Sequence, residues 1–289
     1  MDVIAIIVTF HPGLLQLRAL LDRLEGEVDA VVVVDNGSDA DLAALLAARG
    51  TGDVELIALG ANLGLAAAQN RGLARARDRG CRHVVLFDQD SLPAAGMVGV
   101  LRHGAETRAA AGELIAAVGP GEVETGSGRD AAVPPAGGAV ADGLVEADHL
   151  IASGCLIPVA ALDRIGDMRA ELFIDWVDVE WCLRARAGGL RCYRATGARM
   201  AHAFGEPVTI LGRRFVWRPP LRHYYYFRNA VWLLRQRWIP ASERLAHGGR
   251  VLRRLVLCLV LLRPRGAQWR MAWRGIGDGI AGRMGGAGS

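Results

Sequence analysis

The chain has 289 residues, of which 52% are hydrophobic, so it can bury a large core and is not disordered as a whole. Its net charge of +4 is unevenly spread: residues 213–289 hold 16 arginines and two acids, whereas residues 1–212 hold 18 arginines and 28 acids. The five cysteines are scattered and form no C-x-x-C, which argues against a disulfide framework and against a cysteine zinc site.

The N-terminal half alternates short apolar runs, rich in β-branched residues, with segments of helical spacing. Strands are expected at Val3–Phe10, Ala30–Val34, Val54–Leu59 and Val84–Phe87. Helices are expected between them, at Leu14–Leu24, Asp39–Arg49 and Gly64–Arg79. This order predicts an α/β fold with a doubly wound, mostly parallel sheet and with ligands at the carboxyl ends of its strands.

The order of elements is less regular after Pro93. A helix is expected near Met97–Ala111 and a strand at Leu114–Val118. The Gly-, Ala- and Pro-rich segment Gly119–Gly143 predicts a long loop or a hairpin insertion. After the apolar run His149–Pro158, the amphipathic segment Phe173–Arg186 is expected to be helical and to end at the glycines that follow it.

Polar residues follow three of the expected strands. They are Thr9 to His11 at the end of the first, Asp35 to Ser38 after the second, and Asp88 to Asp90 after the fourth. In a parallel sheet these ends meet at one rim, where nucleotides commonly bind, although each could also be a capped turn. The chain has no G-x-G-x-x-G and no P-loop motif, which argues against a dinucleotide enzyme and a P-loop NTPase.

Asp88 and Asp90 are two residues apart, so at an extended strand end both carboxylates face one side. Two hard oxygen donors suit Mg²⁺ or Mn²⁺ together with phosphate oxygens, and the alternative is a helix cap beside a turn acid. His202 could serve such a site as a metal or phosphate ligand, or it could be structural.

A second acidic cluster lies in the segment "DWVDVEWCLRAR". Helical spacing places Asp175 and Asp178 on one face and turns Glu180 away from Asp178. An acid held beside apolar residues has a raised pKa and could act as a general base. The alternative is that these acids favour a helix N-terminus through its dipole.

Taken in order, these segments resemble those of the family 2 glycosyltransferases, specifically a bacterial rhamnosyltransferase-like branch with the GT-A fold. The matching segments are "IIVTFHP", "VVVVDNGS", "NLGLAAAQNRGLARA", "VVLFDQDS", "ASGCLIP", "LFIDWVDVEWCLRA" and "HYYYFRN". They cover about residues 3–230 in the right order. The resemblance implies a GT-A catalytic domain at residues 1–212 and a basic helical C-terminal region at residues 213–289.

The resemblance also implies roles for residues that bind the donor. Thr9, Asp35 and Asn62 look like the base- and ribose-binding set, with Asp35 accepting from the pyrimidine N3–H. Asn70 looks like a residue that lines the donor pocket, and Asp88 also belongs to the donor-binding residues, through the metal that it would hold on the diphosphate.

For the chemistry, Asp88 and Asp90 match the family's metal-binding D-x-D motif, and His202 matches a histidine that often helps there. Asp178 falls at the catalytic base of the family's E-D motif. Val177 stands where that motif has Glu, so Glu180 remains an alternative base. No mechanistic role follows from the resemblance for "RN" in "HYYYFRN".

The function implied is a metal-dependent, inverting transfer of L-rhamnose from dTDP-β-L-rhamnose to a glycan or lipid-linked saccharide in cell-surface polysaccharide synthesis. Other donors, such as a UDP-hexose or UDP-galactofuranose, stay open, and so does a non-catalytic nucleotide-sugar-binding protein. A sugar nucleotidyltransferase is disfavoured because "TFHPGLLQL" lacks the Gly- and Arg-rich loop of that class.

The C-terminal region interleaves arginine with tryptophan and with the apolar run Leu255–Leu262. This pattern predicts either a helical cap on the catalytic domain or a segment that lies on an anionic membrane surface. Charge alone would allow nucleic acid, but no nucleic-acid-binding module supports it. Without a basic leader or a spanning apolar run, we expect a cytoplasmic protein. If the C-terminal region lies on a membrane, the protein is expected to be peripheral on the inner face of the cytoplasmic membrane.

Overall fold

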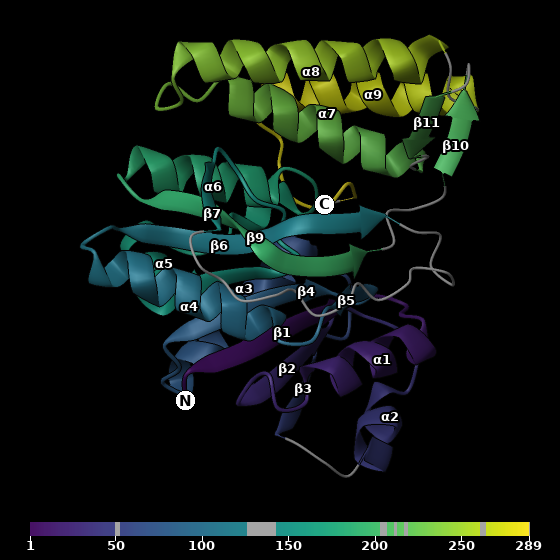
Figure 1. Cartoon of the computed structure of the whole chain (residues 1–289). Coiled ribbons are helices and arrows are strands. Elements are labelled where there is room, and N and C mark those ends of the chain that lie inside the picture. The colour runs from purple at the N-terminus through teal and green to yellow at the C-terminus, as the bar shows by residue number, and fades with distance from the viewer. Residues whose placement is uncertain are drawn as a thin grey trace.

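The structure, a computed structural model, describes residues 1–49, 53–125, 143–202, 207–210, 213–216, 219–260 and 264–288. In this part of the chain, one mixed sheet lies between two layers of helices, and three further helices form a layer beyond it (Figure 1). A separate antiparallel hairpin, β10 (Pro207–Ile210) with β11 (Arg213–Val216), precedes these three helices.

The parallel part of the sheet is built by the first four strands. It runs in the order β3 (Val54–Ala58), β2 (Ala30–Asp35), β1 (Val3–Thr9) and β4 (His83–Asp88). All three neighbouring pairs are parallel, and their register brings Thr9 beside Asp35 and Val8 beside Asp88. The polar residues that follow β1, β2 and β4 therefore meet at one edge, as the sequence predicts.

The sheet continues beyond β4 with strands of mixed direction. They are β8 (Cys155–Pro158), β6 (Ile115–Thr125), β9 (Arg191–His202), β5 (Ser91–Pro93) and β7 (Leu144–Ala147). β6 and β9 are parallel, whereas β8, β5 and β7 pair with their neighbours in antiparallel fashion. The predicted α/β fold with a largely parallel central sheet is confirmed.

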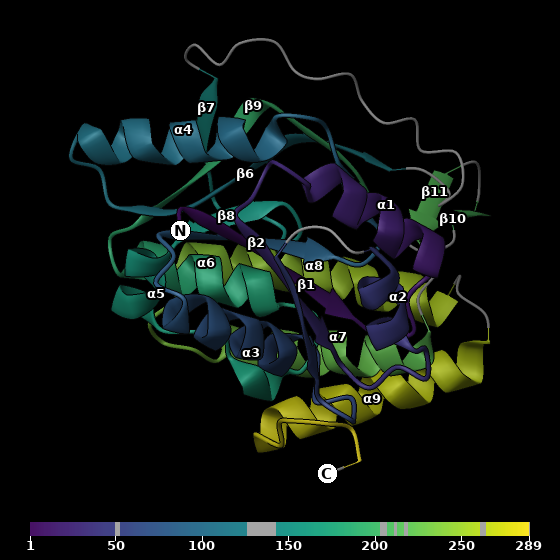
Figure 2. The same ribbon diagram turned by 90° about the horizontal axis from the view of Figure 1, so that it is seen from below.

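Helices cover both faces of the sheet, because successive strand residues point to opposite sides. Ile4 and Ile6 of β1 face the core under α3 (Leu65–Asp78), α5 (Val159–Ile165) and α6 (Val177–Ala187). Ala5 and Ile7 face the core under α1 (Leu14–Leu24), α2 (Leu42–Arg49) and α4 (Met97–Ala110). Figure 2 shows α1 and α4 on one side and α3, α5 and α6 on the other.

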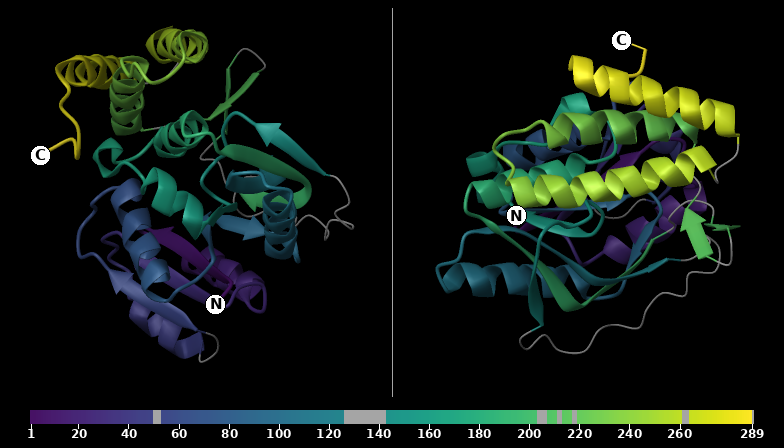
Figure 3. Two further views of the ribbon diagram at one scale, coloured as in Figure 1. Left: turned by 90° about the vertical axis from the view of Figure 1, so that its left-hand side faces the viewer. Right: turned by 90° about the horizontal axis from the view of Figure 1, so that it is seen from above.

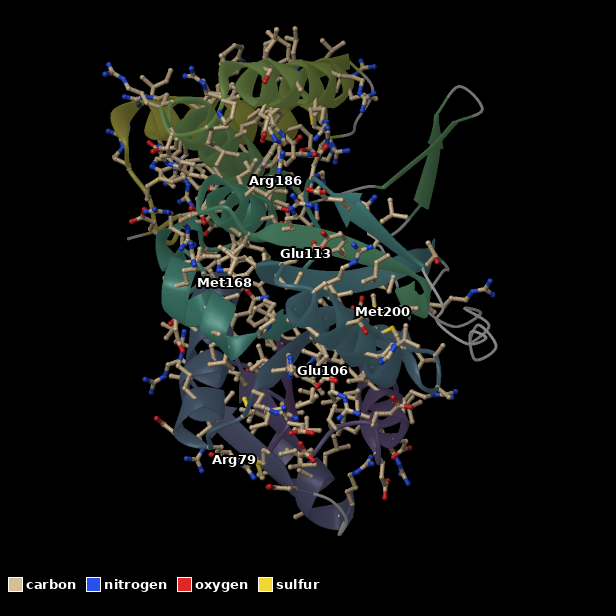
Figure 4. All side chains as sticks on the ribbon, turned by 60° about the vertical axis from the view of Figure 1, so that its left-hand side comes forward. Arg79, Glu106, Glu113, Met168, Arg186 and Met200 are labelled. Atoms are coloured by element: carbon tan, nitrogen blue, oxygen red, sulfur yellow. The ribbon has the colours of Figure 1, made fainter. Side chains whose placement is uncertain are left out.

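The C-terminal helices pack onto the α6 side of the molecule. They are α7 (Pro220–Leu234), α8 (Ala241–Val260) and α9 (Arg265–Ala281), with α7 beneath the other two (Figure 3). Leu183 of α6 shares an apolar cluster with Ala230 and Leu233 of α7. Arg186 of α6, labelled in Figure 4, places Nη2 3.2 Å from Glu243 Oε1 of α8. Among the described helices, none is both long and apolar enough to cross a membrane.

Two sequence expectations need correction. The helix predicted from Phe173 begins at Val177, because Phe173, Asp175 and Trp176 all have positive φ and cannot be helical. Asp175 therefore precedes the helix and shares no helical face with Asp178. β6 runs on to Thr125, past the predicted strand end, and residues 126–142 of the predicted insertion lie outside the described residues. The division of the chain at residue 212 stays a prediction.

Candidate active site

A pocket of about 700 Å³ opens at the carboxyl ends of β1, β2 and β4. One wall carries Asn36 and Asn62, a second carries Asp88 and Asp90, and a third is formed by residues 173–179 around the start of α6. The C-terminal region supplies further lining, including residues of α7 and α8. The pocket therefore lies where an open α/β sheet is expected to bind its ligand.

The nucleotide-binding set expected from the sequence is only partly in the pocket wall. Thr9 and Asp35 are buried, and Thr9 Oγ1 donates to Asp35 Oδ1 at 3.0 Å, while Asp35 Oδ2 accepts from the Ser38 backbone N–H at 3.0 Å. Asn36 and Asn62 line the pocket, and Asn36 Nδ2 donates to Asn62 Oδ1 at 3.0 Å. Asn36 belongs to the recognised "DNGS" turn but was not singled out.

Asn70 does not lie where the sequence argument expects it. It is not among the residues that line the pocket, and both atoms of its side-chain amide are bound to backbone. Nδ2 donates to the carbonyl oxygen of Met168 at 2.8 Å, and Oδ1 accepts from the N–H of the same residue at 3.0 Å. In this structure Asn70 ties α3 to the segment before η1 (Ala170–Leu172).

Asp88 and Asp90 both line the pocket, but a tight turn and not an extended strand brings them there. Asp88 ends β4, and the turn between β4 and β5 contains Asp90. Gln89, between them, also lines the pocket and reaches the end of β1, where its Oε1 accepts from the Phe10 backbone N–H at 2.7 Å. Ser153, whose Oγ accepts from the Asp88 N–H at 3.1 Å, fixes the turn and was missed as a site residue.

The two aspartates fit a hard divalent cation. Among the described residues no cluster of three or more His, Cys, Asp or Glu forms a complete metal cage. Two carboxylates are nevertheless the usual protein share for Mg²⁺, whose other ligands are water and substrate phosphate. The backbone of His202, at the end of β9, pairs with Ser91 directly after this turn. The side chain of His202 lies outside what the structure describes.

Asp175 is held by an arginine of the C-terminal region. Arg222 of α7 donates from Nε to Asp175 Oδ2 and from Nη2 to Oδ1, both at 2.9 Å, and both residues line the pocket. Burial opposes the positive charge, but Asp175, with a smaller contribution from Asp88, raises the pKa of Arg222. Arg222 is thus a cation that Asp175 holds in place and that the negative charge of Asp88 also stabilises.

Asp178 faces the pocket from the first turn of α6. Burial raises the pKa of Asp178, although the backbone N–H of Val179, 2.8 Å from Oδ1, and the nearby His149 favour the charged form. An acid with a raised pKa in a ligand pocket is suited to accept a proton.

Glu180 has a different environment from Asp178. It is fully buried and is not among the pocket-lining residues. Arg184 donates to its two oxygens at 3.0 and 3.1 Å, and Arg169 Nε adds a third contact at 3.3 Å. Both carboxylate oxygens are therefore engaged in an ion-pair network.

Several pocket residues were missed by the sequence argument. His149 lines the pocket, and so do His247 and Arg250 of α8. Burial lowers the pKa of His149 and of His247, and the His247 ring packs edge-on against Trp176 at 5.5 Å between centroids. The recognised "HYYYFRN" segment was the only signal that the C-terminal region reaches the site, because α8 matches no quoted motif.

Comparisons with known proteins identify the family of this chain. Residues 6–128 match the family model for glycosyl transferase family 2. The chain is 32% identical over 255 residues to the dTDP-rhamnosyl transferase RfbF of Shigella flexneri, covering 83% of this chain and 82% of that protein.

Solved structures with the same fold have low sequence identity. GalNAc-T7 with UDP, GalNAc and Mn²⁺ aligns with a TM-score of 0.60 at 12% identity, over 91% of this chain and 58% of that one. A structure of residues 1–349 of S. aureus TarS aligns with a TM-score of 0.54 at 16% identity, over 98% of this chain and 82% of that one.

The fold and the comparisons together define a glycosyltransferase with the GT-A fold. The chain belongs to glycosyl transferase family 2, and within that family it is rhamnosyltransferase-like.

Proposed function

We propose that this protein transfers L-rhamnose from dTDP-β-L-rhamnose to a hydroxyl of a glycan or a polyprenyl-diphosphate-linked saccharide in the synthesis of a cell-surface polysaccharide. One observation carries the proposal. Asp88 and Asp90 line the same pocket as Asp178, in a chain that is 32% identical to a dTDP-rhamnosyl transferase. A cation-binding pair and a proton acceptor are the groups that transfer from a sugar diphosphate requires.

The nucleotide would bind at the Asn36 and Asn62 end of the pocket. Asp35 is fixed by hydrogen bonds from Thr9 and Ser38, so its carboxylate is oriented before any ligand arrives. This supports the role that the family resemblance gives to Asp35, which is to accept from the pyrimidine N3–H.

Asp88 and Asp90 would hold Mg²⁺ or Mn²⁺ against the donor diphosphate. The cation, when bound, supplies positive charge that offsets the charge of the departing dTDP. Arg222 adds a permanent positive charge to the same pocket, with Nε and Nη2 held by Asp175. Its Nη1 has a direction fixed by that pair and is suited to donate to a phosphate oxygen.

Asp178 would act as the base. The acceptor hydroxyl gives its proton to the Asp178 carboxylate while its oxygen attacks the anomeric carbon of the sugar. The bond from that carbon to the diphosphate oxygen breaks, and its electron pair leaves with dTDP. A single displacement inverts the anomeric centre, so a β-L-rhamnosyl donor gives an α-L-rhamnoside.

The metal assignment predicts that Asp90→Ala and EDTA each abolish transfer, measured as dTDP release that depends on an acceptor. Asp163→Ala is the matched control, because Asp163 is a half-exposed acid of α5 that pairs with Arg77 away from the pocket. This variant should keep full activity. Full transfer in EDTA would contradict the assignment.

A donor screen tests the sugar and the alternatives. The protein is mixed with dTDP-rhamnose, UDP-galactose, UDP-galactofuranose or GDP-mannose, and nucleoside diphosphate release is measured. Release only from a UDP-sugar would keep the glycosyltransferase and overturn the rhamnosyl donor. Binding of every donor without release in the presence of saccharide acceptors would favour a non-catalytic nucleotide-sugar-binding protein.

We further propose that α8 and α9 lie on an anionic membrane surface, which would place the enzyme on the inner face of the cytoplasmic membrane. α8 exposes Leu245, Leu252 and Val256 at positions i, i+7 and i+11, and α9 exposes Trp269 and Trp273 one turn apart. The arginines of these helices could contact lipid phosphates.

A further inference from the structure

The turn Glu171–Trp176 directly precedes the helix that carries Asp178, and three of its six residues have a backbone with positive φ. Phe173, Asp175 and Trp176 have φ values of 64°, 64° and 67°. A left-handed backbone is unfavourable for residues with a Cβ atom, and most of all for bulky ones such as Phe and Trp. Such a turn persists only where its surroundings hold it.

The side chain of Asn229 in α7 binds the backbone of this turn. Its Nδ2 lies 2.8 Å from the carbonyl oxygen of Leu172 and 2.9 Å from those of Ile174 and Asp175. One amide nitrogen with two hydrogens thus serves three carbonyls. Asn229 has no exposed surface, so water cannot replace these bonds if the side chain is removed.

Arg228 continues the same set of contacts. Its Nη2 lies 3.2 Å from the carbonyl oxygen of Glu171 and 2.9 Å from that of Leu172. Its Nε donates to Asn229 Oδ1 at 2.9 Å, which fixes the orientation of the asparagine amide. The guanidinium, also fully buried, lies over the ring of Tyr225 at 5.0 Å. The Tyr225 ring thus holds the guanidinium as a second contact surface, in addition to the hydrogen bonds to these carbonyls.

The remaining carbonyls of the turn also have partners. That of Phe173 accepts from the backbone N–H of Ala66 at 3.3 Å, and that of Trp176 accepts from the N–H of Glu180 at 2.9 Å as the first bond of α6. Every carbonyl of the turn is thus satisfied, and four of the six accept from Arg228 or Asn229. The pair fixes the path of the backbone.

We propose that Arg228 and Asn229 are positioning residues for sugar transfer, which hold the turn Glu171–Trp176 so that Asp178 and the Asp175–Arg222 pair face the donor pocket. This inference rests on the function proposed above. Residues 173–179 line the pocket, so a shift of the turn moves a pocket wall and the start of α6 together. If the pair merely attached α7 to the catalytic part, loss of its contacts would lower stability without changing the chemistry.

The test compares Asn229→Ser and Arg228→Lys with Tyr224→Phe in the full chain. Asn229→Ser keeps one hydrogen-bond donor but loses the amide that reaches three carbonyls. Arg228→Lys keeps one charged donor group but loses the guanidinium that reaches the carbonyls of Glu171 and Leu172. Tyr224→Phe is matched, because it keeps the ring that lies under the Arg228 guanidinium at 5.5 Å and removes one buried hydrogen bond of the same helix, from the Tyr224 hydroxyl to Asp278 at 2.9 Å. The readouts are local amide hydrogen exchange, calorimetric binding of dTDP, and kcat as a function of pH.

In Asn229→Ser, we expect the amides of Phe173–Val177 to exchange about 10-fold faster while those of β1 and β4 are unchanged. We expect kcat to fall about 100-fold, because small displacements at a reacting centre cost about that much, with dTDP affinity retained. The titratable groups that face Asp178 are His149 and Asp175. The acid limb of the kcat profile should move to lower pH, because water that reaches Asp178 lowers the pKa that burial had raised. Tyr224→Phe should change none of these.

Unchanged hydrogen exchange in both variants would contradict the inference that Arg228 and Asn229 hold the turn, whatever the activity. Faster exchange with an unchanged kcat and pH profile would overturn the positioning role, and so would an equal loss of kcat in Tyr224→Phe. Hydrogen exchange needs no substrate, so failure of wild-type protein to bind dTDP or transfer rhamnose would count against the proposed function alone.

Discussion

At the scale of single residues, two acids of one helix illustrate how burial decides chemistry. Asp178 and Glu180 lie two residues apart on α6, yet only Asp178 lines the pocket. Glu180 is enclosed with Arg184 and Arg169, which compensate its charge. Burial without such an ion pair raises the pKa of Asp178 and makes it the better proton acceptor.

Asp178→Asn should keep dTDP binding and lower kcat by about 10²- to 10⁴-fold, the usual contribution of a general base. It should also stabilise the protein at neutral pH. Because the folded-state pKa of Asp178 is raised, its contribution to stability is full below the unfolded pKa and is lost as pH rises through the folded pKa. The gain in Tm should therefore be present at pH 8 and vanish near pH 4.

Glu180→Gln provides the contrast. Removing the charge from a fully buried carboxylate that binds two arginines should lower the free energy of unfolding by about 3 kcal/mol. The folded fraction should keep its kcat. If Glu180→Gln abolished turnover in folded protein and Asp178→Asn stayed active, the base would be Glu180.

At the scale of elements, the start of α3 and the turn before α6 depend on each other. Gly64 has φ +94°, and a Cβ placed there would lie 2.6 Å from the Phe173 ring and 2.9 Å from the Phe173 Cα. Only glycine permits both this backbone conformation and this approach. The glycine of the recognised "NLGLA" segment is thus required by a contact with the turn that Asn229 holds.

Gly64→Ala should therefore destabilise the protein by about 3 kcal/mol, the sum of left-handed strain and overpacking, and should also reduce kcat. Gly80→Ala is the matched control, because Gly80 has φ +66° and a Cβ there would meet nothing within 4 Å. That variant should cost only about 1 kcal/mol and leave activity unchanged. Chemical denaturation and initial rates measure both effects. Equal losses in the two variants would contradict the packing argument.

At the scale of the whole molecule, the C-terminal helices serve the site on one side and face outward on the other. α7 carries Arg222 to the pocket and Asn229 to the turn before α6, and α8 and α9 form the outer layer (Figure 3). Arg222 and Arg228 of the basic C-terminal region thus bind the pocket wall and the turn before α6, whereas other arginines of this region lie on the outer helices.

The proposed membrane surface predicts that the full chain co-sediments with anionic vesicles and that binding weakens with salt. Trp269→Ala with Trp273→Ala should reduce binding, because both indoles are exposed on α9. Leu15→Ser is the matched control, since Leu15 is an exposed apolar residue of α1, remote from these helices. Equal vesicle binding by all three proteins would contradict the proposal.

Much of the fold could be predicted from the sequence, because hydrophobic periodicity is a local property. The run from Val3 to Thr9 reads as a buried strand, and the leucines of Leu14–Leu24 mark one face of a helix. Where backbone conformation depends on distant partners the prediction failed. The segment at Phe173 was expected to be helical, but contacts from residues more than 50 positions away hold it as a turn.

The sequence by itself determined the class of the sheet, the D-x-D motif at its edge and the two candidate bases, because hydrophobic periodicity and motif spacing are local properties. Only the tertiary structure separated Asp178 from Glu180, moved Asn70 out of the pocket and brought Arg222 and His247 into it. These outcomes depend on burial and on contacts between segments far apart in the chain. The positions of α7 and α8 over the pocket follow from packing against α6, which no local pattern encodes.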